Sequence, residues 1–167
     1  YDVLPSLTLT ARASSDLFTE ERRNITSKGT INANTGQFED RNIYRRENNY
    51  DFLANHNTTL ADGLSLNTLV GWNVNQITST RTRLLANDLV VSNVYNPANA
   101  LSVANERDES LRRLYGGFFD LGFSYKDYLF VNLIGRNDWS STLPVANRSY
   151  FYPGASSSFI FTDAFDI

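Results

Sequence analysis

The segment from Tyr115 to Arg136, YGGFFDLGFSYKDYLFVNLIGR, decides the fold class of this chain. From Tyr115 to Tyr125 every second position is aromatic, leucine or glycine, and the same alternation resumes at Leu129. Successive side chains of a β-strand point to opposite faces, so a period of two predicts two strands that each have one apolar face. Lys126 and Asp127 lie between them, which predicts a tight antiparallel hairpin.

Four further segments repeat this alternation, which brings the predicted number of strands to six. They begin near Leu7, Tyr50, Leu64 and Phe151. The strand from Tyr50 leads through the short turn Ala61-Asp62-Gly63 into the strand from Leu64. The sequence therefore predicts an all-β, antiparallel architecture.

The connections between these strands alternate in length. Short turns lie at Ala61 to Gly63 and at Lys126 to Asp127, whereas long polar connections are expected over Ser15 to Asn48, Gln76 to Arg113 and Asn137 to Ser149. Short turns at one end of the strands and long loops at the other are typical of an outer-membrane β-barrel. We therefore expect a segment of an antiparallel transmembrane barrel, with short periplasmic turns and long extracellular loops.

Composition and charge exclude several other classes of protein. The formal net charge is −3 and the calculated pI is about 5.1, which argues against binding to nucleic acid. There is no cysteine, so a disulfide scaffold, a thiolate zinc site and a catalytic thiol are excluded. No apolar run approaches the roughly 18 to 20 residues of a membrane-spanning helix.

In a transmembrane barrel, alternate side chains of each strand face the lipid and the lumen. The predicted lipid-facing residues are Leu66, Val70, Val74, Phe119, Leu121, Phe123, Leu129, Val131 and Leu133. The predicted lumen-facing polar residues are Asn67, Asn73, Asn75, Asp120, Asn132, Arg136 and Asp138. Aromatic residues gather at strand ends, as the girdles at the two membrane interfaces require: Trp72, Tyr115, Tyr125, Tyr128, Trp139, Tyr150 and Tyr152.

The residues from Leu114 to Phe165 resemble the distal barrel of SusC-like TonB-dependent transporters, the SusC/RagA family. The similarity rests on YLFVN after the turn, on GRNDWSSTLP (Gly135 to Pro144) and on NRSYFYPGASSSFIF (Asn147 to Phe161). Leu60 to Asn73, LADGLSLNTLVGWN, is similar in style, and the first fifty residues match in pattern only.

The resemblance implies a barrel of about 22 strands around a plug domain. It further implies the TonB-dependent import of oligosaccharides or peptides across the outer membrane, and a SusD-like surface lipoprotein over the extracellular mouth. Residues 1–167 then form a partial barrel domain, with the plug and the TonB box outside this chain. Expected partners are outer-membrane lipid and lipopolysaccharide, the SusD-like lipoprotein, the substrate, and TonB through the missing N-terminal region.

No set of residues predicts an enzyme, a bound cofactor or a metal site. His56 is the only histidine and has no partners at ligand spacing. Arg136 and Asp138 share one strand face, and they predict either part of a polar substrate path or a salt bridge to the neighbouring strand of Asp120. Charged clusters fall in the predicted long connections, where solvated loop charge is the simpler interpretation: Glu20 to Arg23, Arg45 to Glu47, Arg81 to Arg83 and Glu106 to Arg113.

Two alternatives stay open at the level of sequence. One is a soluble, secreted β-sandwich that binds carbohydrate through exposed aromatics such as Trp72 and Trp139, with its apolar faces buried against a second sheet. The other is a small, complete eight-stranded barrel. It needs two more strands, for which Thr30 to Tyr44 and Leu84 to Tyr95 are the available segments. Asn96-Pro97 further predicts the start of a brief helix running toward Ala104.

Overall fold

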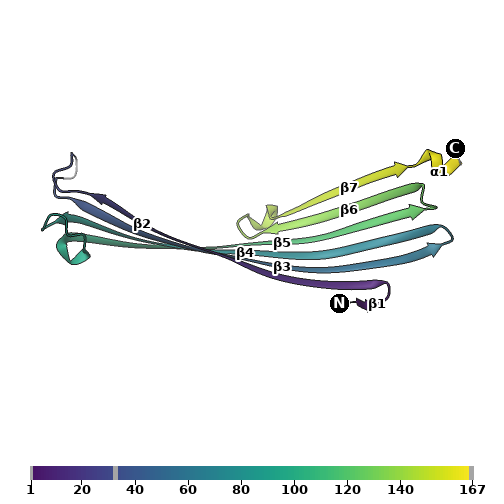
Figure 1. The fold of residues 1–167 in the computed structure, drawn as a ribbon, viewed down its shortest axis with the longest axis horizontal. Coiled ribbons are helices and arrows are strands. Elements are labelled where there is room, and N and C mark those ends of the chain that lie inside the picture. Colours follow the sequence, from purple (N-terminus) through teal and green to yellow (C-terminus); the bar gives the residue numbers. More distant parts are fainter. Residues whose placement is uncertain (1, 32–33, 166–167) are drawn as a thin grey trace. The chain divides into compact units, whose positions relative to one another are not determined.

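A computed structural model describes residues 2–31 and 34–165, and over these residues the chain forms one antiparallel sheet (Figure 1). The strands follow one another in space in the order of the sequence, β1-β2-β3-β4-β5-β6-β7. Their bounds are Asp2–Leu4 (β1), Leu7–Thr26 (β2), Gln37–Ala61 (β3), Leu64–Leu89 (β4), Ala100–Tyr125 (β5), Leu129–Ser140 (β6) and Ser149–Phe159 (β7). The all-β antiparallel prediction is confirmed: β2 to β7 contain the six predicted strands, and β1 is an additional short strand.

The sheet divides into two compact units. Unit 1 comprises residues 1–15, 48–76 and 112–167, and unit 2 comprises residues 16–47 and 77–111. The long strands β2, β3, β4 and β5 contribute residues to both units, whereas β6 and β7 belong to unit 1 alone.

The tight turns of unit 1 lie where the sequence predicts them. Lys126 and Asp127 have φ of 46° and 58°, and the Tyr128 N–H donates to the Tyr125 carbonyl at 3.2 Å. Two successive positive φ values are those of a type I′ turn, whose twist matches that of the flanking strands. Gly63 has φ of 70°, and its carbonyl accepts the Lys126 N–H at 2.6 Å. That bond ties the β3–β4 turn to the β5–β6 turn.

Two of the three predicted long connections are wrong over most of their length, because the strands continue through them. β2 extends to Thr26 and β3 begins at Gln37, so the connection is residues 27–36 rather than 15–48. β4 extends to Leu89 and β5 begins at Ala100, which leaves residues 90–99. These strand extensions carry charges that pair across the sheet, so their polarity does not mark them as loops. In the third connection β6 continues to Ser140, and residues 141–148 remain between the strands.

The connection of residues 90–99 contains the predicted helix start, although in a shorter form. Pro97–Asn99 form one turn of 3₁₀-helix, and Asn96 Oδ1 accepts the Ala98 N–H at 2.9 Å. β5 begins directly afterwards at Ala100, so the helix does not approach Ala104. A second 3₁₀ turn spans Val145–Asn147, and the short helix α1 spans Phe161–Phe165. No helix within residues 2–31 and 34–165 is long and apolar enough to cross a membrane.

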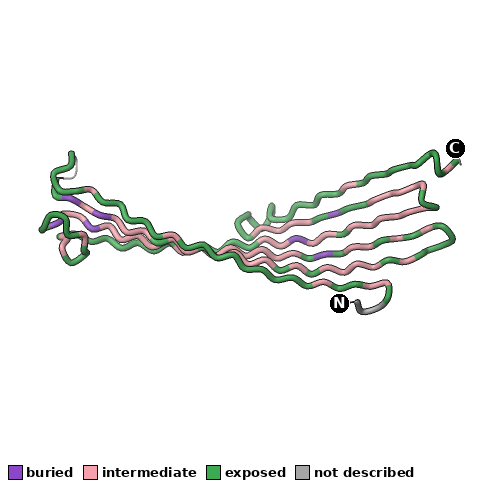
Figure 2. The backbone as a smooth tube through the Cα atoms, viewed as in Figure 1, coloured by how far each residue is buried: buried purple, intermediate pink, exposed green. Residues whose placement is uncertain are grey.

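Buried apolar side chains are few among the described residues, and they lie in unit 2. Phe38 and Ala86 are 0% exposed and Leu89 is 2% exposed, and Leu84, Tyr95 and Ala100 pack against them. The Phe38 ring meets the Tyr95 ring edge-on at 6.3 Å. Figure 2 shows that most other positions are exposed or half-buried.

Neither alternative architecture matches this fold. A sandwich needs a second sheet to cover the apolar face, whereas the described residues form a single sheet. Of the segments available for two extra strands, residues 37–44 belong to β3 and residues 84–89 to β4. Residues 30–31, 34–36 and 90–95 lie in connections, and residues 32–33 lie outside the described residues.

Candidate functional site

Unit 1 presents one apolar face and one polar face, and the pairing of β5 with β6 defines the apolar one. Leu121 lies opposite Leu133 and Phe123 opposite Val131, while Phe119 lies opposite Gly135. A Cβ at Gly135 would contact the Phe119 ring and, from β7, the ring of Phe151 at 3.2 Å. The residues of β5 and β6 that the sequence predicts to face lipid therefore share one face of the sheet.

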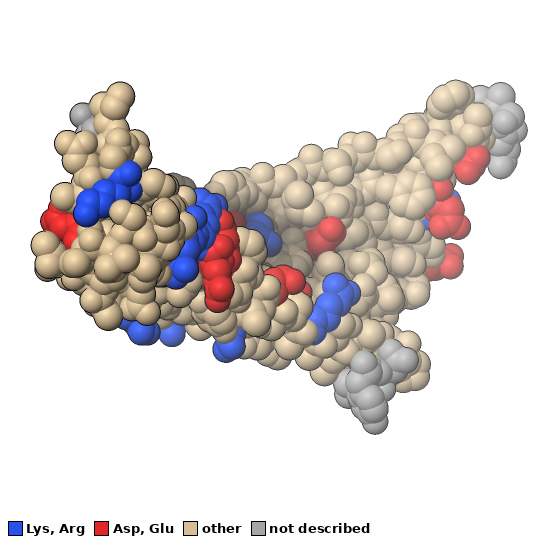
Figure 3. Space-filling view, turned by 60° about the vertical axis from the view of Figure 1, so that its left-hand side comes forward, with Lys and Arg blue, Asp and Glu red and all other residues tan. Residues whose placement is uncertain are grey.

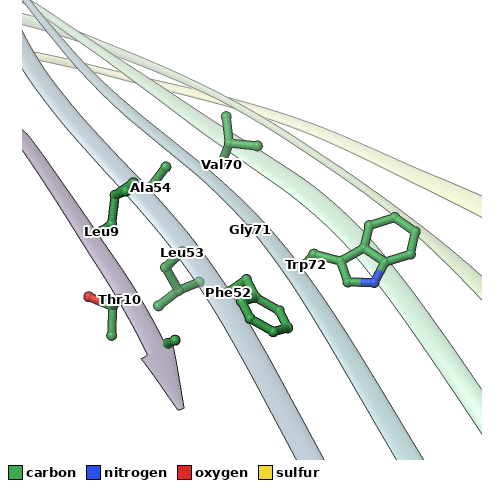
Figure 4. A pocket seen from close by; sticks show the side chains of 9 residues that line it. Leu9, Thr10, Phe52, Leu53, Ala54, Val70, Gly71 and Trp72 are labelled. Carbon is green, nitrogen blue, oxygen red and sulfur yellow. The ribbon is translucent and has the colours of Figure 1, made fainter. Parts of the chain in front are cut away.

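The apolar face continues over β2, β3 and β4 as a shallow groove of about 630 Å³ (Figure 4). Leu9 of β2, Phe52 and Ala54 of β3, and Val70 and Trp72 of β4 contribute side chains to it. Phe52 is 56% exposed and Val70 is 50% exposed, which are high values for large apolar side chains. By strand alternation Leu66 and Val74 lie on the same face as Val70.

The opposite face carries pairs of carboxamide and carboxylate side chains across β3 and β4. Asn73 Nδ2 donates to Asp51 Oδ1 at 2.6 Å, and Asn75 Nδ2 donates to Asn49 Oδ1 at 2.7 Å. Further along, the Asn67 amide donates to the side-chain oxygens of Asn55 and Asn57. The three asparagines predicted on β4 thus lie on one face, and each has a side-chain partner on β3.

The polar face extends onto β5 and β6, where Gly122 leaves space between asparagine side chains of neighbouring strands. Gly122 lies opposite Asn132, and a Cβ built at Gly122 would be 3.6 Å from Asn132 Oδ1 and 3.8 Å from Asn67 Cβ. Asn67 and Asn132 therefore lie on either side of Gly122. Asn57, Asn67, Gly122 and Ser124 line a hollow of about 400 Å³ on this face.

Arg136 and Asp138 of β6 form the charged part of the polar face. Arg136 Nε donates to Asp138 Oδ1 at 2.8 Å and to Oδ2 at 3.1 Å, and the guanidinium lies 5.6 Å from the centre of the Phe118 ring. The predicted salt bridge to the neighbouring strand of Asp120 is wrong, because the register places Phe118 opposite Arg136 and Ile134 opposite Asp120. Gly116 leaves room for the pair, since a Cβ there would be 2.7 Å from Asp138 Oδ1.

The aromatic residues predicted at strand ends divide between the two faces, and the prediction is wrong for Trp72 and Tyr115, which lie inside β4 and β5 because these strands continue into unit 2. A Cβ on Gly117 would touch the rings of both Trp72 and Trp139, and Trp139 lies opposite Tyr115, so these three aromatics lie on the apolar face. Tyr150 lies opposite Asp138 and Tyr152 lies opposite Arg136. These two tyrosines therefore lie on the polar face, and their placement in a girdle on the apolar face is wrong.

Unit 2 carries ion pairs between each two neighbouring strands from β2 to β5. Arg23 of β2 donates to Asp40 of β3 at 2.5 and 2.6 Å. Arg83 of β4 lies 3.1 Å from Glu39 of β3 and 3.3 Å from Glu106 of β5. Arg81 Nε, also on β4, donates to Asp108 of β5 at 3.1 Å. In Figure 3 basic and acidic side chains lie side by side in the part of the molecule turned forward. The charge clusters assigned to solvated loops are thus strand residues.

Hydrogen bonds within two of these ion pairs shift the pKa values of the paired groups. The hydrogen bond from Arg83 is the largest cause that lowers the pKa of Glu39 below its ordinary 4.5. The hydrogen bond from Arg23 likewise lowers the pKa of Asp40 below its ordinary 3.8. The two carboxylates also raise the pKa values of Arg83 and Arg23. Nε of Arg41 and Nε of Arg83 are buried without a hydrogen-bond partner.

Sequence reasoning missed these cross-strand ion pairs, although the sequence carries a signal for those of β3, β4 and β5. The charges stand two residues apart: Glu39 and Arg41, Arg81 and Arg83, Glu106 and Asp108. A spacing of two is the spacing of one strand face, and two such rows of opposite sign can pair across adjacent strands.

The side chains of the polar face can bind a ligand through hydrogen bonds. His56 lies half-buried within β3, and the described residues contain no group of three or more His, Cys, Asp or Glu side chains that could hold a metal ion. Amide, hydroxyl, guanidinium and carboxylate groups on an open sheet face can donate to and accept from a hydrated polar ligand.

This arrangement defines a class of structure, an antiparallel β-sheet with one apolar and one polar face. Neither a protein-family model nor a curated protein matches the chain. Among solved structures, the chain is similar to one described as the RagAB peptide transporter, with a TM-score of 0.84 at 15% sequence identity. The match covers 97% of this chain and 19% of that chain.

Two further structures show the same similarity in other states of that protein. The RagAB peptide importer in its open-open state matches with a TM-score of 0.78 at 16% identity, over 97% of this chain and 18% of that chain. The closed-closed state matches with 0.80 at 17% identity, over 98% and 19%. This chain therefore has the fold of a segment of those proteins, and it spans about a fifth of their length.

Proposed function

We propose that this chain is part of the barrel wall and extracellular loops of a SusC-like, TonB-dependent transporter of the outer membrane, which imports oligosaccharides or peptides. The single observation that carries the proposal is the fold match to the RagAB transporter, with a TM-score of 0.84 over 97% of the chain. The motifs from Leu114 to Phe165 point to the same family independently of the coordinates.

In this proposal the two faces of unit 1 have different surroundings. The face of Phe119, Leu121, Val131 and Leu133 contacts lipid, which removes the exposure of large apolar side chains that the isolated sheet presents. The face of Asn67, Asn73, Asn132 and Arg136 lines the lumen, where water and polar substrate satisfy its hydrogen-bonding groups.

The lengths of the strands support this arrangement. β6 and β7 have 12 and 11 residues, and a membrane strand needs about 9 to 11. Tyr128 and Trp139 mark the two ends of β6 and are separated by about 36 Å of strand at ~3.3 Å per residue. A tilt of about 40° reduces this to about 28 Å across the bilayer, close to the height of an apolar band between two girdles.

We assign the residues of unit 2 to the extracellular side. β2 to β5 have 20, 25, 26 and 26 residues, about twice the length that a bilayer requires. Their unit 2 segments carry eight of the ion pairs that the described residues form, and such charge is costly within lipid. A SusD-like lipoprotein and lipopolysaccharide are the partners proposed for this side, and TonB acts through the plug region outside this chain.

The location of the faces can be tested by cysteine labelling, because residues 1–167 contain no cysteine that would compete with an introduced one. Asn132→Cys and Leu133→Cys are compared in the full-length protein in outer-membrane vesicles, with a water-soluble maleimide. We expect rapid labelling at position 132 and protection at position 133, since adjacent strand residues face lumen and lipid respectively. Equal labelling of both variants, or recovery of the protein in the soluble fraction, would contradict the proposal.

The transport activity needs its own measurement. Cells that produce the full-length protein are given a fluorescent peptide or a fluorescent oligosaccharide, with and without a protonophore. We expect energy-dependent accumulation of one of the two classes, which also identifies the substrate class. Accumulation that is the same in cells without the protein would overturn the proposed function.

A further inference from the structure

Trp72 connects two cavities on the apolar face of unit 1. On one side it ends the groove lined by Leu9, Phe52 and Val70 (Figure 4). On the other side it lines a cavity of about 300 Å³ together with Tyr115, Trp139, Ser140, Ser141 and Arg148. The first cavity is lined mostly by apolar side chains, and the second, which is also mostly apolar, adds Ser141 and Arg148. The apolar surface therefore acquires polar groups on the far side of the Trp72 ring.

The two indole rings at this point are held side by side. The rings of Trp72 and Trp139 have centroids 5.5 Å apart and planes inclined by 33°. Gly117, on the strand between them, provides the space, because a Cβ there would be 3.0 Å from Trp72 Cζ3 and 3.7 Å from Trp139 Cζ3. Any larger residue at this position would have to displace Trp72.

The polar part of the cavity is positioned by the connection between β6 and β7. The Ser141 N–H donates to the Arg113 carbonyl at 2.9 Å, and the Arg113 N–H donates to Ser141 Oγ at 2.8 Å. These two reciprocal hydrogen bonds hold Ser141 against Arg113 of β5 and leave the Ser141 hydroxyl proton available to donate. Arg148 is exposed and forms no ion pair with any acidic side chain among the described residues. A guanidinium and a hydroxyl near an aromatic rim are suited to a phosphate group.

We propose that these two cavities form one binding site for a phosphate-bearing, anionic membrane lipid. The lipid phosphate contacts Arg148 and the hydroxyl of Ser141, and one acyl chain lies past Trp72 along Phe52, Val70 and Leu9. The inference rests on the proposed function, which places this face in a bilayer. It goes beyond that function, because a girdle of interfacial aromatics by itself shows no preference among lipids.

Quenching of tryptophan fluorescence by brominated lipid tests the proposal. The full-length protein is placed in phosphatidylcholine nanodiscs, and increasing fractions of dibrominated phosphatidylglycerol or dibrominated phosphatidylcholine are introduced. The Trp72→Phe, Trp139→Phe double variant supplies the background of any other tryptophans. We expect quenching of Trp72 and Trp139 to reach half its maximum at an about fivefold lower fraction of the anionic lipid.

Two variants distinguish a specific lipid site from the mere location of this face in the membrane. Arg148→Gln should remove the preference for the anionic lipid, whereas Arg12→Gln, the same change of charge on the opposite face of the sheet, should retain it. Equal quenching by both lipids, or a preference that survives in Arg148→Gln, would overturn the lipid site while the membrane location stands. If neither lipid quenches the two tryptophans, the proposed function itself fails, and the lipid site fails with it.

Discussion

Glu39 of β3 and Arg83 of β4 form an ion pair at 3.1 Å, and Arg83 also lies 3.3 Å from Glu106 of β5. One arginine thus links three neighbouring strands. Buried hydrophobic side chains are few in unit 2, so we infer that cross-strand ion pairs help to hold these strand extensions in register.

The first prediction concerns the pH dependence of unit 2. Hydrogen bonds from Arg83 and Arg23 lower the folded-state pKa values of Glu39 and Asp40 below 4.5 and 3.8. A lowered pKa contributes stability that is present above the unfolded-state value and is lost as the pH falls through the folded-state value. We therefore expect the backbone amides of these strands to lose protection below about pH 4.5, measured as hydrogen-exchange protection factors corrected for intrinsic rates.

A matched variant isolates this effect. Glu39→Gln keeps the size of the side chain and removes the charge, so it should lower the protection of the β3 and β4 amides at pH 7 and flatten the change between pH 7 and pH 4. High salt should weaken the wild-type protection in the same direction, because exposed ion pairs are screened. Protection that is independent of both pH and salt would show that these ion pairs contribute nothing to the stability of unit 2.

The second prediction concerns the two faces of β5 and β6. Leu121→Arg places a charge on the face that we assign to lipid and should lower the free energy of unfolding by roughly 2 to 4 kcal/mol near the bilayer midplane. Asn132→Ala on the other face should have a small effect. Urea unfolding of the full-length protein in lipid vesicles measures both, and equal costs at the two positions would refute the assignment of the faces.

The third prediction uses two glycines of the polar face as a matched pair. A Cβ at Gly71 would overlap the Phe118 ring, whereas a Cβ at Gly122 meets nothing closer than 3.6 Å. We expect Gly71→Ala to lower the free energy of unfolding by about 1 to 3 kcal/mol, the usual cost of overpacking. Gly122→Ala should be close to neutral.

A second substitution tests the cause of this cost. Phe118→Leu combined with Gly71→Ala should recover part of the lost stability, and a double-mutant cycle measures the coupling. Additive costs would show that the Phe118 ring is not what the new methyl group meets.

The fourth prediction concerns the β5–β6 turn. Asp127 has φ of 58°, a region in which glycine is not strained. Asp127→Gly should therefore raise the free energy of unfolding by roughly 0.5 to 1 kcal/mol, because it removes the steric strain of a non-glycine residue at positive φ. Asp127→Pro, which fixes φ near −65°, should prevent the turn from forming. Urea unfolding measures the first variant, and the yield of folded protein in the membrane fraction measures the second.

The sequence by itself determined the unit 1 parts of β2 to β7, the two tight turns and the two faces of these strands, but not the short strand β1. These features are local, because alternation of period two defines a strand face and the few residues of a tight turn define its backbone angles. For this reason the residues from Tyr115 to Arg136 predicted β5, β6 and their turn correctly.

Only the tertiary structure decided how the polar segments are arranged. Residues 15–48 and 76–113 look like loops because many of their alternating positions carry charges rather than apolar side chains. Whether Arg83 finds Glu39 and Glu106, or Arg136 finds Asp138 instead of Asp120, depends on the register between strands. Register relates residues far apart in the chain, and a shift by one residue reverses every face, so the spacing within one strand cannot reveal it.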